Sequence, residues 1–243
     1  MSALVRHSLA AASFTLTLAY ASSAQAVYVD PTIGSAYPLF TSIAGSVSYD
    51  GWNELSRTGL GFASTDTAGA TQALVDGIQA NIIGSGDAVL ARASGTLYPA
   101  GSALYNAGNN NPQVLSISDS TVASGITTLV LQSYVGLLQP ASYATAVLDI
   151  NGGTQSLLAN SVTGVVVGAD GEAYRTWTWD LTGLGAVDSY SLQFTVGGGA
   201  VQAWAFQVDQ VAAAVPEPAT TALMAAGVGV IGFIGRRRSA ARR

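Results

Sequence analysis

The chain has 243 residues, with 9 basic and 14 acidic side chains, no cysteine and one histidine. All the basic residues are arginine, and the histidine, His7, precedes the first predicted processing site. A mature chain without histidine, cysteine or lysine cannot build a Ser-His-Asp triad, a cysteine nucleophile, a Schiff base or a histidine zinc site.

The N-terminus has the pattern of a secretory signal peptide. Arg6 is followed by an apolar stretch over residues 9–20 and then by small residues that end in Ala24-Gln25-Ala26. A positive start, a short apolar segment and an A-x-A site are the three parts of such a signal. We therefore predict a signal peptide over residues 1–26, cleaved after Ala26, and an exported body.

The body, residues 27–214, is long enough for one domain with a good core. Its 13 acids face three arginines, Arg57, Arg92 and Arg175, so its net charge is −10. Such a charge excludes binding to nucleic-acid backbones by electrostatic attraction, and no nucleic-acid partner is expected. Without cysteine an exported fold has no disulfide, so its stability must come from its core.

Apolar and polar residues alternate through the first half of the body. Short strands are predicted at residues 45–49, 87–96, 114–117 and 126–135. Residues 69–83 carry Leu74, Ile78 and Ile82 at a spacing of four, which favours a short helix. Residues 105–112, with three consecutive asparagines, are predicted to form a loop.

The second half of the body gives a clearer pattern. Strands are predicted at 143–150, 162–167, 174–181, 190–196 and 204–208, separated by turns rich in Gly, Asn and Asp. The alternation places Arg175, Trp177, Trp179 and Leu181 on one face, and it places Trp204 on one face with Phe206 and Val208. The spacing predicts one all-β domain, an antiparallel β-sandwich or jelly roll of 8–10 strands.

Two kinds of side chain in the body suggest sites. Trp177, Trp179 and Trp204 are predicted to lie in the core, the commoner use of large aromatic residues. Trp52, beside a turn, is the candidate for an exposed glycan contact. Calcium prefers carboxylate and carbonyl oxygens. The weak candidates for calcium ligands are therefore Asp50, Asn53, Glu54, Asp170 and Glu172, although solvated turn acids explain them better and no metal site or cofactor is assigned.

The C-terminal 29 residues have three parts in a fixed order. Val215-Pro216-Glu217-Pro218-Ala219-Thr220 comes first, and its prolines keep the backbone extended. Residues 219–235 carry no charge and would span roughly 26 Å as a helix, the short end of a membrane span. Five arginines follow and would stop transfer on the cytoplasmic side: Arg236, Arg237, Arg238, Arg242 and Arg243.

This order resembles the PEP-CTERM sorting signal of exopolysaccharide-producing Gram-negative bacteria. The resemblance covers residues 215–243, and the body is similar, loosely, to the jelly-roll ectodomains found in front of such tails. The stretches that carry this second likeness are 49–52, 176–181 and 206–209. The resemblance implies that an exosortase, a membrane-embedded protease, recognises and cuts the chain near the motif while the tail holds it in the inner membrane.

We therefore expect an exported, exosortase-sorted protein that is transiently membrane-anchored and then reaches the cell surface or matrix. There it would associate with exopolysaccharide and contribute structurally to biofilm or floc formation, without an activity of its own. Two alternatives stay open. A carbohydrate-binding module would need at least two exposed, coplanar aromatic side chains. A carboxylate-based polysaccharide-degrading enzyme would need two acids about 5 to 10 Å apart in a groove.

Overall fold

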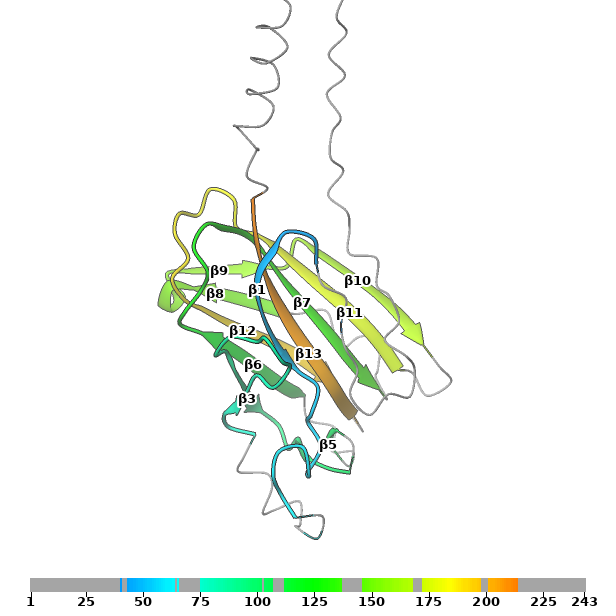
Figure 1. The fold of residues 1–243 in the computed structure, drawn as a ribbon. Helices are drawn as coiled ribbons and strands as arrows, with labels where there is room; N and C mark the ends of the chain where they lie inside the picture. Colours follow the sequence, from blue (N-terminus) through cyan, green and yellow to red (C-terminus); the bar gives the residue numbers. More distant parts are fainter. Residues whose placement is uncertain are drawn as a thin grey trace, which may run out of the picture.

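The computed structural model describes residues 40, 43–63, 65, 75–101, 103–106, 112–136, 146–167, 172–197 and 201–213. Within these residues the chain forms two antiparallel sheets that face each other (Figure 1). The predicted all-β sandwich is confirmed. Among the described residues no helix is long and apolar enough to cross a membrane. The predicted signal peptide and the predicted span at 219–235 both lie outside them.

Sheet A contains the longest strands, β13, β7 and β11. The path of sheet A is β10 (Ser161–Val167), β11 (Glu172–Asp180), β7 (Ile126–Gly136), β13 (Val201–Ala212), β5 (Leu104–Asn106) and β4 (Tyr98–Pro99), and β1 (Ser46–Trp52) also pairs with β13. The path of sheet B is β2 (Ile78–Gln79), β3 (Val89–Ser94), β6 (Gln113–Asp119), β12 (Tyr190–Gly197), β8 (Ala146–Ile150) and β9 (Gln155–Leu158).

All nine predicted strands are present, with ends that differ by a few residues. Residues 143–145, which were predicted to begin β8, lie outside the described part. The described part holds thirteen strands rather than eight to ten, because β2, β4, β5 and β9 were not predicted. These four strands have two to four residues each. Such short segments are too brief to show a periodicity, and pairing with a neighbour defines them.

The helix predicted over 69–83 is wrong in its described part, residues 75–83. There the chain turns at Val75 and Asp76 and then forms β2, whose Ile78 pairs with Leu90. The apolar spacing has another cause: Ile78 is buried in the core, and Ile82 packs beside Gly51. The spacing of Ile78 and Ile82 therefore arises from two separate contacts with strands. In the sequence alone, this spacing looks the same as one apolar face of a helix.

The loop predicted over 105–112 is also wrong at its start, since Tyr105 and Asn106 belong to β5 and pair with β13. Residues 107–111 lie outside the described part. The low strand preference of Asn106 is outweighed here by its tertiary setting, because the residue is buried and pairs with Val201.

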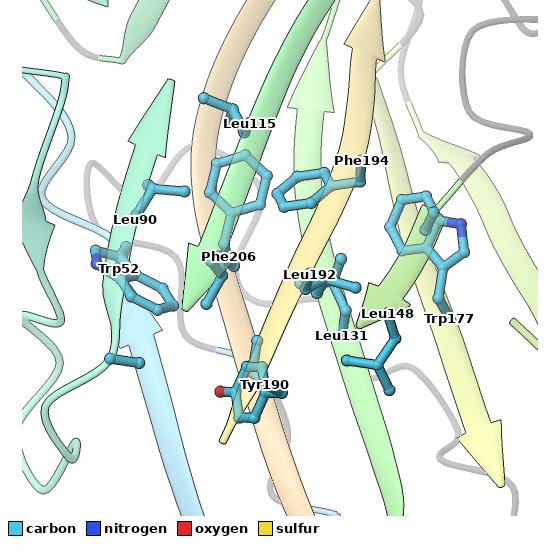
Figure 2. Close-up of a cluster of buried hydrophobic side chains, with 14 of the residues drawn as sticks. Trp52, Leu90, Leu115, Leu131, Leu148, Trp177, Tyr190, Leu192, Phe194 and Phe206 are labelled. Carbon is cyan, nitrogen blue, oxygen red and sulfur yellow. The ribbon is translucent and has the colours of Figure 1, made fainter. Parts of the chain in front are cut away.

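The core lies between the sheets and is rich in aromatic side chains (Figure 2). Phe194 of sheet B meets Phe206 of sheet A edge to face, with ring centroids 5.2 Å apart. Trp177 lies 6.3 Å from Phe194 on the other side. Burial of each large apolar side chain stabilises the fold by about 1.5–3 kcal/mol. Contacts of this kind, rather than disulfides, hold the two layers together.

Candidate functional site

The described part of the chain ends at Ala213, directly before the predicted sorting segment. Residues 214–243, with the motif Val215–Thr220 and the five terminal arginines, lie outside it. The structure therefore describes the segment that leads into the motif, which is the C-terminal half of β13.

This half of β13 is held between two strands. It pairs with β7 on one side and with β1 on the other, so that Val211 lies opposite both Thr128 and Ser46. At the exit, the backbone N–H of Ala212 donates to the carbonyl of Gly45 over 3.3 Å. Since both edges of the strand are paired, its end is fixed until three residues before Val215.

Asp209 anchors the outer face of β13. Its carboxylate is 1% exposed and accepts three side-chain hydrogen bonds, from Ser46 Oγ at 3.0 Å, Gln207 Nε2 at 2.9 Å and Gln132 Nε2 at 3.2 Å. Burial raises the pKa of Asp209, and these hydrogen bonds partly offset the rise. The carboxylate thus ties β13 to β1 and β7 through side chains as well as through the backbone.

Gln210 anchors the inner face of the same strand. Its Nε2 donates to Oδ2 of Asp119 at 2.7 Å, and its Oε1 accepts from the backbone N–H of Ala123 at 2.7 Å. Asp119 belongs to sheet B, so this side chain joins the two sheets beside the exit of the chain.

A group of acids surrounds this bridge. Asp50, on β1, is 1% exposed and accepts from the N–H of Ala88 at 3.2 Å. Burial raises the pKa of Asp50 to about 6, and the nearby carboxylates of Asp119 and Asp87 add to the rise. Thr121 donates to both Asp87 and Asp119. Burial and the same three carboxylates raise the pKa of Tyr190.

The structure describes only part of the candidate calcium ligands. Asp50 and Asn53 are buried, whereas Glu54 is exposed. Asp170 lies outside the described residues, as does the side chain of Glu172. Within the described residues, no group of three or more acidic side chains is placed to hold a metal ion.

Trp52 is not the exposed glycan contact that its turn context indicated. It is 0% exposed, and its Nε1 donates to the carbonyl of Ile78 at 2.9 Å. Trp52 is the last residue of β1, and the pairing of β1 with β13 places it opposite Phe206, in the core between the sheets. The prediction that Trp177 and Trp179 are core residues is confirmed, as both are 0% exposed. These three tryptophans therefore cannot form the exposed platform of a carbohydrate-binding module.

Trp204 lies on the opposite face from the one predicted. The pairing of β13 with β7 shifts by one residue between Ala203 and Ala205, which is a β-bulge at Trp204. The bulge reverses the alternation, so Phe206 and Val208 point inward while Trp204 packs on the outer face. There it stacks on Tyr134 at 4.7 Å, and Tyr134 stacks on Tyr174 at 4.2 Å. Tyr134 and Tyr174 are 7% and 1% exposed, so neither adds a second exposed ring to Trp204 in this row.

Sequence reasoning missed Asp119, Asp209 and Gln210 as anchors. The alternation of β13 indicated a polar face at Asp209, which normally means exposure to solvent. No local signal distinguishes a solvated aspartate from one that receives three side-chain hydrogen bonds. The missing information is the identity of the strands on either side.

The described body is thus a two-sheet β-sandwich whose last strand runs directly into a C-terminal appendage. That appendage matches the PEP-CTERM protein-sorting motif over residues 214–238. The chain therefore carries a PEP-CTERM sorting motif, which indicates export, membrane-associated sorting and processing by an exosortase. The two-sheet body is consistent with the jelly-roll likeness noted above.

The body itself has weaker likenesses. No curated protein matches the chain. Among solved structures, it is similar to a family GH115 4-O-methyl-α-glucuronidase, BtGH115A, with specificity for decorated arabinogalactans. The identity is 10% and the TM-score 0.29, and the match covers 71% of this chain but 19% of the other. The chain thus spans about a fifth of that enzyme.

Proposed function

We propose that this chain is a structural component of an extracellular exopolysaccharide matrix in a Gram-negative bacterium, delivered there by exosortase sorting. The observation that carries the proposal is the PEP-CTERM motif at 214–238, placed directly behind the last strand of a β-sandwich. The protein would be exported, held in the inner membrane by its tail, cut near the motif and released to the cell surface or matrix.

The geometry of β13 favours presentation of the motif to a membrane-embedded protease. The strand is fixed by Asp209 and Gln210 almost to its end, and Pro216 and Pro218 keep the following segment extended. Few residues separate the fixed strand from the motif. The protease would therefore receive an extended peptide at a short and constant distance from a rigid body.

The composition of the body supports a structural rather than a catalytic role. With a charge of −10 and no histidine, cysteine or lysine after the signal, it resembles an inert, soluble domain. We propose that it has no catalytic activity of its own and that it contributes to biofilm or floc formation by contact with exopolysaccharide.

Intact mass measured on the protein from its native host tests the sorting step. In cells with the exosortase we expect a chain that begins at Val27 and ends near residues 216–220. In cells that lack the enzyme, the chain should still end at Arg243. The substitution Glu217→Gln within the motif should reduce cleavage. Glu54→Gln, the same change at an exposed position of the body, should not. Retention of Arg243 in both strains would contradict the proposal.

Fractionation tests the matrix role separately. In exosortase-positive cells, the processed protein should sediment with the exopolysaccharide, and it should move to the free medium when polysaccharide synthesis is abolished. If the processed protein is found in the medium in both strains, sorting stands but association with the matrix does not.

A further inference from the structure

The strands at the ends of the two sheet paths differ greatly in length. In the described part of the chain, β2 and β4 have two residues each and β9 has four, whereas β10 has seven. Very short edge strands, and proline as at Pro99 of β4, are ways in which proteins prevent pairing with other chains. Only β10 among these four is long enough to template another strand.

β10 also lacks the other devices that protect an edge. Its sequence, Ser-Val-Thr-Gly-Val-Val-Val, contains no charge and no proline, and five of its seven residues are β-branched. Its pairing with β11 runs without a register shift from Ser161 opposite Thr178 to Val167 opposite Glu172. Among the described strands β11 is its only partner, and no described strand pairs with its other side.

Two exposed apolar side chains lie at and just before β10 in the chain. Val162 on β10 is 43% exposed, and Leu158, at the end of β9, is 72% exposed. They are two of the four large hydrophobic side chains that the described part exposes. Ser161 and Thr163 are exposed as well, which leaves the first half of the strand open to solvent. A long, regular, uncharged edge with exposed apolar residues is a site for strand pairing.

We propose that β10 is a self-association edge that pairs antiparallel with β10 of a second copy of this chain. A two-fold axis at Gly164 would place Val162 opposite Val166 of the second copy and Thr163 opposite Val165. Such pairing brings no like charges into contact, because β10 carries none. A second copy suits the edge because each β10 strand then extends the sheet of the other copy.

The other sheet ends determine the size of the assembly. An isologous contact uses the same surface on both copies and is closed after two. The other described edges of sheet A are β4, which has two residues, and β1, which pairs only with β13. The free side of β1 is covered, because the carbonyl of Tyr49 accepts from Gly86 and that of Gly51 accepts from Asn81 and Ile82, so neither edge is open to continue the combined sheet. The expected product is therefore a dimer and not a fibre. This inference does not depend on the matrix role.

Sedimentation of the protein recovered from its exporting host tests the dimer. Thr163→Lys should raise the dissociation constant at least about tenfold, because the pairing would then place two lysines as diagonal neighbours on one face of the joined sheet. The matched control is Gln193→Lys, at an exposed position in the middle of sheet B, and it should leave the constant unchanged. A monomer in the wild type, or a Thr163→Lys variant that dimerises as well as the control, would overturn the proposal.

Cross-linking tests the register without dependence on the lysine variant. The native chain has no cysteine, so any disulfide comes from introduced residues. Chains with Thr163→Cys mixed with chains with Val165→Cys should form a disulfide-linked dimer on oxidation. Thr163→Cys chains alone should form much less, because two copies of residue 163 are not opposite each other. Equal yields, or no linked dimer in the mixture, would overturn the proposed pairing.

Discussion

Gln210 and Asp119 join the two sheets through a buried hydrogen bond, with Nε2 of Gln210 2.7 Å from Oδ2 of Asp119. The two residues are 91 positions apart in the chain. The contact holds β13 against sheet B beside the point where the sorting segment begins, so the stability of the fold and the placement of the motif depend on the same side chain.

Gln210→Leu should lower the free energy of unfolding by about 1–3 kcal/mol, since it removes the hydrogen bonds that Gln210 makes to Oδ2 of Asp119 and to the N–H of Ala123. Urea denaturation measures the change. Gln193→Leu, at an exposed position, should have little effect. Equal stability of the two variants would show that the bridge does not matter.

Lowering the pH should stabilise the fold through Asp50. The pKa of Asp50 is raised to about 6 in the folded chain, against 3.8 for the ordinary group, so the folded state binds the proton more tightly. Its favourable contribution is therefore complete at low pH and is lost as the pH rises through about 6. Between pH 7.5 and pH 5 we expect Asp50 to add about 1 kcal/mol to the free energy of unfolding.

Denaturation curves at both pH values test this effect, with Asp50→Asn as the comparison. Asparagine keeps an oxygen that can accept from Ala88 but does not titrate, so the variant should show a smaller gain at pH 5 than the wild type. If the two proteins gain equally, the pH dependence comes from other groups.

Trp52→Phe should destabilise the protein by about 1–3 kcal/mol, because it leaves a cavity and removes the hydrogen bond to the carbonyl of Ile78. Trp204→Phe should cost less than half as much, since Trp204 is half-buried on the outer face. Equilibrium unfolding in urea compares the two. Equal losses would contradict the placement of Trp52 in the core.

Gly95→Ala should destabilise the protein by about 1–3 kcal/mol. Gly95 has a φ of +101°, and an added Cβ would lie 2.3 Å from Oε1 of Gln113, which accepts from the N–H of Thr96. Gly101→Ala, where an added Cβ meets nothing within 4 Å, is the control and should be close to neutral. Thermal unfolding of both variants decides the question.

Much of the fold could be predicted because alternation is a local property. Leu192, Phe194 and Val196 alternate with polar residues in the strand predicted at 190–196, and all three are buried. Ala146, Leu148 and Ile150 of β8 are likewise buried. The sorting motif could likewise be recognised from the sequence, since its extended peptide, apolar run and basic end follow one another along the chain.

Other features required the tertiary structure. Trp52 appeared exposed beside its turn, but Ile78 and Phe206 bury it from distant parts of the chain. The bulge at Trp204 reverses the alternation of β13, and only the pairing with β7 reveals it.

The sequence by itself therefore determined the class of fold and the sorting motif, because these depend on composition and on patterns within a few residues, and the same kind of pattern predicts the signal peptide. The tertiary structure decided which polar and aromatic side chains are buried, and which edge of the sandwich is open. Burial and pairing are properties of neighbours in space. Strand order and register determine those neighbours, as for Gln210 and Asp119, and no stretch of sequence contains that information locally.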